Sequence, residues 1–245
     1  MTRWKLVIEY DGTGFVGWQR QDNGPSVQEA MERAVKAFCG EDAVVWCAGR
    51  TDAGVHALGQ VAHLDIEKST TARTVRDAIN QHLKPLPIAV LSAEPVDAQF
   101  HARLSARRRL YRYRIVNRRA PLAIERNRAW HVPYALDADA MRAAAQALVG
   151  RHDFSTFRAS LCQAKSPVKT LDELSVARDG EEITVTARAR SFLHHQVRNM
   201  VGTLSLVGRG KWTSADVASA LAAKDRTKGG PTAPPEGLYL VEVGY

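Results

Sequence analysis

The 245-residue chain has few cysteines and no long apolar stretch. Its three cysteines, Cys39, Cys47 and Cys162, are odd in number and widely spaced, so they form neither a disulfide framework nor a CxxC metal knuckle. No run approaches the ~20 apolar residues that a membrane-spanning helix needs. The first residues alternate like a strand and lack the apolar core of a secretory signal. These absences predict a globular protein of the reducing cytoplasm.

Acidic residues are missing from one strongly basic segment. Lys and Arg outnumber Asp and Glu by 34 to 26, which gives a net charge of +8 and favours a polyanionic partner. The segment 103–119 contains eight arginines and no acidic residue. Such a run is also typical of a solvated basic face. Tyr111 and Tyr113 lie among the arginines, however, and aromatic rings stack on bases while guanidinium groups bind phosphates. The segment therefore indicates a nucleic-acid partner.

Apolar periodicity predicts an α+β fold in two related subdomains. We expect strands near 4–10, 44–46, 60–66, 88–94, 110–116, 171–176, 183–189 and 238–243, and helices near 26–39, 73–83, 137–149, 192–207 and 214–223. Hairpins as well as helices connect these strands, so each sheet should be mixed and mainly antiparallel, with helices packed on one side. The boundary is placed after residue 103, giving subdomains 1–103 and 104–245 with an active-site cleft between them. The basic segment 224–237 is expected to be a flexible loop.

The stretch CAGRTDAGVHALGQVAHLD, residues 47–65, holds a loop that is longer than a hairpin turn requires. Asp52 in this loop has a simple alternative explanation, because aspartates often cap their own turns. The nearby glycines, however, let the backbone bend and let a bulky ligand approach; they are Gly49, Gly54 and Gly59. Arg50 can hold the carboxylate ionised or bind a phosphate. The pair indicates nucleophile or base chemistry at Asp52.

Two other candidate sites are weaker. His56, His63 and the pair His194–His195 are better explained by polar surface or hydrogen-bonded packing than by zinc, since adjacent helix residues point about 100° apart. Glu9–Thr13 resembles the loop of an aspartyl-phosphate phosphatase, but glutamate replaces the nucleophilic aspartate and shifts it by about a bond length. This stretch is interpreted as a turn. Arg198 is typical of a helix surface, yet its place after the arginine-rich hairpin keeps it a candidate.

Five segments in order resemble the TruA-type tRNA pseudouridine synthases and cover nearly the whole chain. They are YDGTGFVGWQ, GRTDAGVHALGQVAH, FHARLSARRRLYRYRI, SFLHHQVRNMVG and EGLYLVEV. The resemblance implies an isomerase that converts uridine to pseudouridine at positions 38, 39 and 40 of the tRNA anticodon stem-loop. It implies no metal and no cofactor, and it implies a homodimer.

The resemblance also implies a role for each candidate residue. Asp52 would attack C1′ of the ribose or C6 of the uracil, or assist loss of a ribose proton. Arg50 would hold the flipped-out nucleotide, and Tyr111 would pack on the uracil and take the C5 proton. Arg198 would pair with Asp52, and Leu240 would form an apolar wall. The arginines of 103–119 and the segment 224–230 would bind phosphates. A phosphatase and a non-catalytic RNA-binding module are the alternatives.

Overall fold

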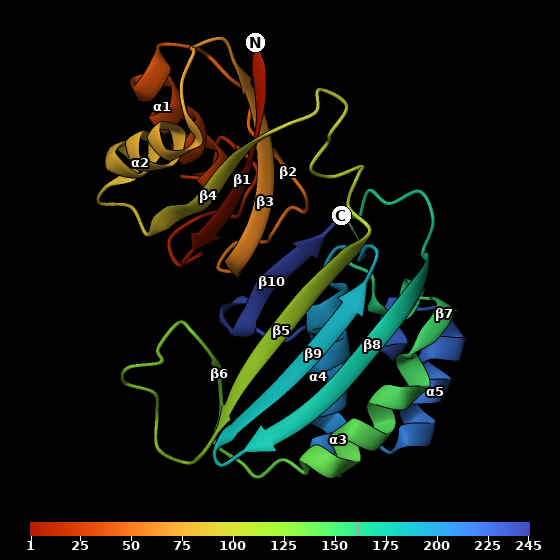
Figure 1. Ribbon diagram of the computed structural model, residues 1–245. Helices are drawn as coiled ribbons and strands as arrows, with labels where there is room; N and C mark the ends of the chain where they lie inside the picture. Colours follow the sequence, from red (N-terminus) through yellow and green to blue (C-terminus); the bar gives the residue numbers. More distant parts are fainter. Residues whose placement is uncertain (161) are drawn as a thin grey trace. The chain divides into compact units, whose positions relative to one another are not determined.

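The computed structural model describes residues 1–160 and 162–245 and divides into two compact units (Figure 1). Unit 1 consists of Met1–Arg107 together with Tyr239–Tyr245, and unit 2 consists of Arg108–Leu238. The last strand was expected in the subdomain 104–245. It groups instead with unit 1, because its residues pair with a strand of that unit. Among the described helices, none has the length and apolar character needed to cross a membrane.

Unit 1 is a mixed sheet with two helices on one face (Figure 1). Its strands lie in the order β4–β1–β3–β10, and β2 also pairs with β3. The pairs β1–β3, β1–β4 and β2–β3 are antiparallel, whereas β10 runs parallel to β3. The elements are β1 (Thr2–Tyr10), α1 (Val27–Cys39), β2 (Trp46–Cys47), β3 (His56–Ile66), α2 (Ala72–Leu83), β4 (Ile88–Val96) and β10 (Leu238–Gly244).

The core of unit 1 follows from the two periodicities of its sequence. Alternate residues of β1 are buried, namely Trp4, Leu6, Ile8 and Tyr10. The apolar stripes of α1 and α2 are buried as well, with Val27, Met31, Ala34, Val35, Val75, Ile79 and Leu83. Ser26 caps α1 by accepting a hydrogen bond from the Glu29 amide at 3.2 Å. The expected strand–helix pattern of the first part of the chain is therefore confirmed.

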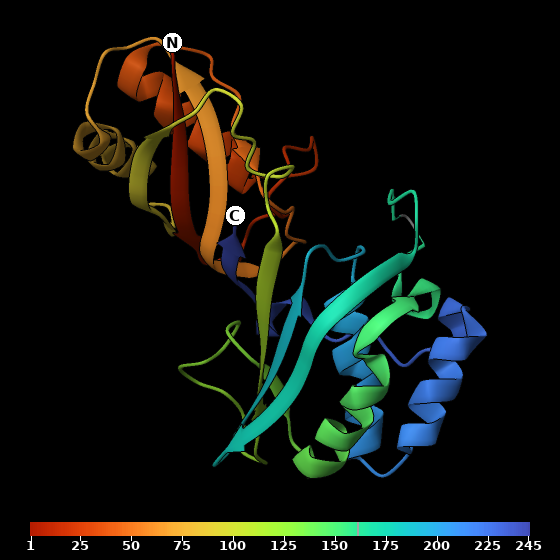
Figure 2. The same ribbon diagram turned by 45° about the vertical axis from the view of Figure 1, so that its right-hand side comes forward.

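Unit 2 repeats the layered arrangement with a mainly antiparallel sheet and three helices on one face (Figure 2). The strand order is β5–β9–β8–β7, and β6 runs parallel to β5. The elements are β5 (Arg108–Asn117), β6 (Trp130–Val132), α3 (Ala138–Ala145), β7 (Gly150–Asp153), β8 (Val168–Asp179), β9 (Glu182–Ala189), α4 (Gln196–Gly208) and α5 (Ser214–Ala223). The α+β class is confirmed.

Some local expectations need correction. The short strands β6 and β7 were not anticipated, because three or four residues carry too little alternation to be detected. The helix expected from residue 192 begins at Gln196, after His195 adopts a left-handed conformation with φ 62°. The helix expected over 137–149 is regular only to Ala145 and ends in a 3-10 turn. The Asp-Gly hairpin is confirmed, with Gly180 at φ 55° between β8 and β9.

Candidate active site

The loop at 48–55, which joins β2 to β3, carries Arg50 and Asp52 in unit 1. The Trp18 N–H, from the segment that follows β1, donates to the Thr51 carbonyl at 3.1 Å. The Asp52 side chain is half-buried, whereas Arg50 is exposed. The loop thus carries a half-buried carboxylate at Asp52 and an exposed side chain at Arg50, on a main chain that is hydrogen-bonded to a second segment.

Glycines in the first motif make this contact between the two segments possible. A Cβ on Gly12 would lie 2.1 Å from the Val55 carbonyl oxygen, and one on Gly17 would lie 2.6 Å from the Thr51 carbonyl oxygen. Gly17 has φ 108° and forms an isolated antiparallel bridge with Asp52. The motif YDGTGFVGWQ therefore packs against the Asp52 loop, and any side chain at these two positions would separate them.

Gly54 in the loop and Gly59 in β3 have different purposes. Gly54 has φ 74°, which supports the sharp turn. Gly59 was expected to admit a ligand, but a Cβ there would lie 2.4 Å from the Val241 carbonyl oxygen of β10. This glycine therefore allows the last strand to approach β3, and the expectation was wrong for Gly59.

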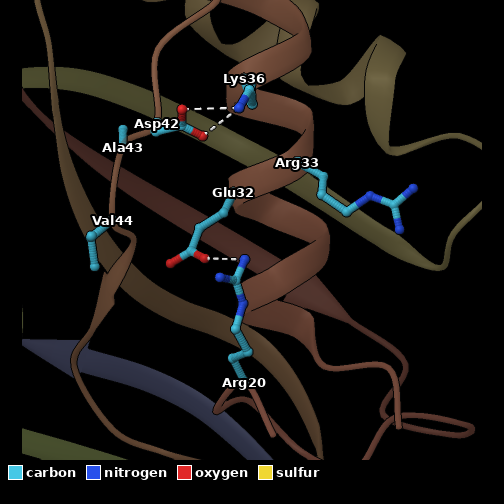
Figure 3. A pocket seen from close by; sticks show the side chains of 7 residues that line it. All are labelled: Arg20, Glu32, Arg33, Lys36, Asp42, Ala43 and Val44. Carbon is cyan, nitrogen blue, oxygen red and sulfur yellow. Dashed lines mark hydrogen bonds and ion pairs between the residues drawn. The ribbon is translucent and has the colours of Figure 1, made fainter. Parts of the chain in front are cut away.

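Helix α1 contacts the segment that follows Trp18, and a small pocket of about 180 Å³ lies beside these contacts (Figure 3). Glu32 forms an ion pair with Arg20 at 2.7 Å, and its carboxylate also accepts from Gln28 at 3.0 Å. Gln28 in turn accepts from Gln19 at 2.8 Å and from the backbone N–H of Arg20 at 3.1 Å. The Lys36–Asp42 ion pair at 2.8 Å lines the other side of the pocket. The contacts of Glu32 and Gln28 anchor Gln19 and Arg20, just after Trp18.

Other groups near the loop are explained by structure. Asp11 accepts from the Thr13 amide at 2.9 Å, so the end of the stretch forms a turn, whereas Glu9 and Tyr10 belong to strand β1 and the expected turn is wrong for those two residues. His56 accepts from the Gly12 amide at 3.0 Å, and His63 accepts from the Ala102 amide at 3.2 Å, so both are hydrogen-bonded packing residues as expected.

The cysteine nearest the loop is not a competing nucleophile. Burial raises the pKa of the Cys47 thiol to about 12. A thiol with such a pKa stays protonated at neutral pH and is a poor nucleophile. Asp52 is therefore the better candidate for covalent chemistry in this part of unit 1.

Leu240 was expected to form an apolar wall. It lies on β10 opposite Ala57 of β3 and is fully buried. The structure thus places Arg50, Asp52 and Leu240 in unit 1, whereas Tyr111 and Arg198 belong to unit 2.

In unit 2 the tyrosines of β5 differ in what they can do. Tyr111 packs edge-to-face against Phe192, with ring centroids 5.2 Å apart. Tyr113 is fully buried, and its hydroxyl donates to the Pro234 carbonyl at 2.7 Å. Burial and the nearby charge of Glu236 raise the pKa of Tyr113 well above 10, so the hydroxyl keeps the hydrogen that it donates. The expectation that Tyr113 stacks on a base is therefore wrong.

Arg198 projects from α4 and is hydrogen-bonded to an extended segment. Its Nε donates to the Ala233 carbonyl at 2.8 Å, while the Ala233 N–H donates to the Arg198 carbonyl at 3.1 Å. The Tyr113–Pro234 hydrogen bond fixes the next residue of the same segment. Arg198 is thus not a free surface arginine: its guanidinium plane is oriented by a backbone carbonyl.

The segment 224–237, expected to be a flexible basic loop, is instead tied to α4. Arg226 donates to the Gly230 carbonyl at 3.0 Å, to Asn199 at 3.2 Å and to Thr232 at 3.1 Å. Thr232 also donates to Asn199 at 2.7 Å. Asn199, only 1% exposed, was missed by the sequence reasoning, although an asparagine inside an apolar helix face is a detectable signal.

The eight arginines of 103–119 divide into two groups. Arg114 forms a bidentate pair with Glu182 at 2.9 Å and contacts Glu125 at 2.8 Å, and Arg118 pairs with Glu181 at 3.1 Å. Buried Arg109 donates to the Arg190 carbonyl. The exposed members are Arg103, Arg107, Arg108, Arg112 and Arg119. Of these arginines, only the exposed group is available to a partner without the loss of a described ion pair or buried contact.

Comparisons with known proteins agree with this architecture. A family model described as tRNA pseudouridine synthase matches residues 6–104 and 144–245. A tRNA pseudouridine synthase A from Rhodospirillum centenum is 65% identical over 245 residues, with full coverage of both chains. Proteins of the same name from Paramagnetospirillum magneticum and Parvibaculum lavamentivorans are 64% and 61% identical, and the match covers 96% and 100% of those chains.

These matches define an isomerase that acts on tRNA. The chain belongs to the tRNA pseudouridine synthase family.

Proposed function

We propose that this protein isomerises uridine to pseudouridine at positions 38, 39 and 40 of the tRNA anticodon stem-loop, with Asp52 acting on a flipped-out nucleotide. The observation that carries the proposal is the loop at 48–55. The main chain of this loop is hydrogen-bonded to Trp18. Its Asp52 carboxylate is half-buried, and its Arg50 side chain is exposed. A base inside a paired stem is out of reach of a side chain, so eversion has to precede chemistry.

Asp52 supplies the reacting carboxylate in this proposal. Its carboxylate attacks C1′ of the ribose or C6 of the uracil, or it assists loss of a ribose proton. In each case the glycosidic bond to N1 breaks and the base turns before the bond to C5 forms. No electrons leave the substrate and none are added, so the reaction needs no redox cofactor. Arg50 holds the everted nucleotide through a phosphate or by filling the vacated space.

The groups of unit 2 complete the proposed machinery. Tyr111 packs on the uracil, and its hydroxyl takes the C5 proton late in the reaction as it gives its own proton to solvent, while N1 of the turned base gains a proton. Arg198 pairs with Asp52 and keeps it ionised, with a guanidinium already oriented by the Ala233 carbonyl. Leu240 forms an apolar wall; because it is fully buried, contact with a base requires its surroundings to open. Exposed arginines of 103–119 and exposed Lys224 and Lys228 bind phosphates.

The homodimer and the cytoplasmic location stay predictions. Binding to tRNA through exposed arginines and lysines should weaken steeply as salt rises, because each phosphate contact releases counterions.

One experiment separates this function from its alternatives. Unmodified tRNA is incubated with the protein in EDTA and then treated with a pseudouridine-specific chemical label. We expect label at positions 38–40, with no change in the mass of the tRNA. A phosphatase that uses Glu9–Thr13 would release phosphate and require Mg²⁺, and a binding module would leave the tRNA unlabelled. Either of those two results would overturn the proposal.

A further inference from the structure

Gln60 is a fully buried glutamine within a strand that is otherwise largely apolar. It lies on β3 directly opposite Ile8 of β1, which is also fully buried, so both side chains face the helix-covered side of the unit 1 sheet. Burying an amide without hydrogen-bond partners is unfavourable, and an aliphatic residue would fill the same space without that cost. The partners of the amide therefore indicate why glutamine occupies this position.

Those partners belong to the backbone of the Asp52 loop. β2 and β3 pair at Trp46–His63 and Cys47–Ala62, and the Ala48 N–H donates to the Val61 carbonyl at 2.7 Å. The next residue, Gly49, stands where the ladder would continue opposite residue 60. Here the side chain replaces the ladder: the Gln60 Nε2 donates to the Gly49 carbonyl at 2.7 Å, and the Gly49 N–H donates to the Gln60 Oε1 at 3.4 Å. The loop leaves the sheet at a point held by this amide.

The same amide continues into a buried chain of hydrogen bonds. Its Nε2 also donates to the Tyr10 hydroxyl at 3.4 Å, and that hydroxyl lies 2.8 Å from the Thr51 Oγ1. Either hydroxyl can be the donor in the contact between Tyr10 and Thr51. Tyr10 is 4% exposed and Thr51 is 6% exposed, so water does not compete for these groups. Thr51 is adjacent to Asp52, and its carbonyl is the one that accepts from Trp18.

We propose that Gln60 is a positioning residue for the reaction: through Gly49 and through Tyr10–Thr51 it fixes the loop on both sides of Arg50 and so sets the place of the Asp52 carboxylate. This inference rests on the proposed function, since it needs Asp52 to be the reacting group. A misplacement of about 1 Å can reduce the rate of an enzymatic reaction by about 100-fold. The hydrogen bonds of Gln60 therefore affect the rate of the chemical step, and the affinity for tRNA depends on them much less.

The test is Gln60→Leu, which keeps the volume of the side chain and removes its hydrogen bonds. We expect single-turnover pseudouridine formation at saturating enzyme to fall by about 10-fold to 100-fold. The dissociation constant for tRNA should stay within about 3-fold of the wild-type value, because the phosphate-binding side chains are untouched. Tyr10→Phe breaks only the link to Thr51 and should lower the same rate by a smaller factor. It serves as the second variant if Gln60→Leu fails to fold.

Asn80 provides a matched control in the same unit. Its side chain makes the same kind of two-bond clamp, donating to the Val90 carbonyl at 2.9 Å and accepting from the Val90 N–H at 2.7 Å, on α2 and β4. Asn80→Leu removes an equivalent pair of hydrogen bonds that do not touch the Asp52 loop. We expect it to lower the unfolding temperature while the single-turnover rate at 25 °C stays at the wild-type level.

Gln60 and Tyr10 should also be coupled. If both residues act through one series of hydrogen bonds, the double variant Gln60→Leu with Tyr10→Phe will lose less single-turnover rate than the product of the two single fold-losses. The inference is overturned if the rates of Gln60→Leu and Asn80→Leu fall equally, or if the loss in Gln60→Leu lies in tRNA affinity alone. An active Asp52→Asn variant would instead overturn the proposed function. An inactive Asp52→Asn with a fully active Gln60→Leu would remove only the positioning role.

Discussion

The candidate site residue Asp52 of unit 1 lies on a loop, whereas the candidate site residue Arg198 of unit 2 projects from a helix. The Asp52 loop leaves β2 after Cys47 and is held by a buried amide, a tyrosine hydroxyl and the backbone of Trp18. Arg198 stands on α4 and is oriented by one carbonyl of a segment that is itself anchored by Asn199 and Tyr113. The carboxylate on the loop depends on contacts that fix its main chain, whereas the main chain of Arg198 is already fixed by the helix and the contact with Ala233 orients its guanidinium group.

The largest expected effect is the removal of charge at Asp52. Asp52→Asn keeps the shape of the side chain but removes the nucleophile, so turnover should fall by on the order of 10³-fold or more. Binding of tRNA, measured by filter retention or anisotropy, should persist. Substantial turnover by this variant would assign the chemistry to another group and make the contacts of the loop irrelevant to catalysis.

Arg198→Lys tests the other unit. A lysine has no Nε donor at that position and presents a point charge in place of a planar fork, so the hydrogen bond to Ala233 is lost. We expect kcat to fall by about 10-fold to 100-fold and KM for tRNA to change much less. Equal losses in kcat and in tRNA affinity would make Arg198 a binding residue.

A smaller effect is expected from Asn199→Ala, which loosens the segment that orients Arg198. Asn199 donates to the Phe157 carbonyl at 2.8 Å and accepts from Arg226 and Thr232, so truncation leaves buried groups unpaired. Such a loss costs about 2 kcal/mol in unfolding free energy. Amide hydrogen exchange should become faster at residues 226–233 before it changes elsewhere in unit 2. Unchanged exchange there would show that other contacts hold the segment.

The smallest effect concerns acid stability, and it belongs to unit 1. Burial and the neighbouring charges of His101 and Arg3 lower the pKa of His63 from 6.5 to about 4. The unfolded chain therefore takes up a proton between these pH values that the folded chain does not. The stability that neutral His63 contributes is complete above pH 6.5 and is lost as the pH falls towards 4.

Urea unfolding at pH 7 and pH 5 measures this dependence. His63→Gln should flatten the decrease in unfolding free energy, and His82→Gln, a change at an exposed histidine of α2, should leave it as in the wild type. If His63→Gln has the same pH dependence as the wild type, the carboxylates govern acid unfolding.

Local patterns predicted the elements well, because most of these helices and strands bury one face against a single core. The alternation in β1, the stripe in α1 with its Ser26 cap and the Asp-Gly turn after β8 all depend on neighbouring residues only. Strands β6 and β7 escaped notice because their pairing partners, not their own sequence, make them strands. The last strand joined unit 1 for the same reason: its partner, β3, lies far away in the chain.

The sequence indicated the candidate residues of the site better than it indicated the contacts that hold them in place. Asp52 and Arg50 could be singled out because a long glycine-containing loop is unusual between paired strands. The purpose of Gly59 and the tied conformation of 224–237 could not be foreseen, since each depends on a contact with a distant residue. Gln60 could have been noticed in the sequence, because it is a polar residue at an inward position of a largely apolar strand, but the sequence analysis did not single it out.

By itself, the sequence determined the approximate position of most helices and strands and which loop carries the carboxylate, because side-chain periodicity and turn chemistry act over a few residues. Only the tertiary structure decided that Tyr113 is a buried anchor, that Arg114 belongs to an ion-pair group and that Gln60 replaces a missing ladder step. Hydrogen bonds and burial depend on atoms within about 3 Å and 4 Å of each other. The groups that meet at those distances come from residues that are far apart in the chain.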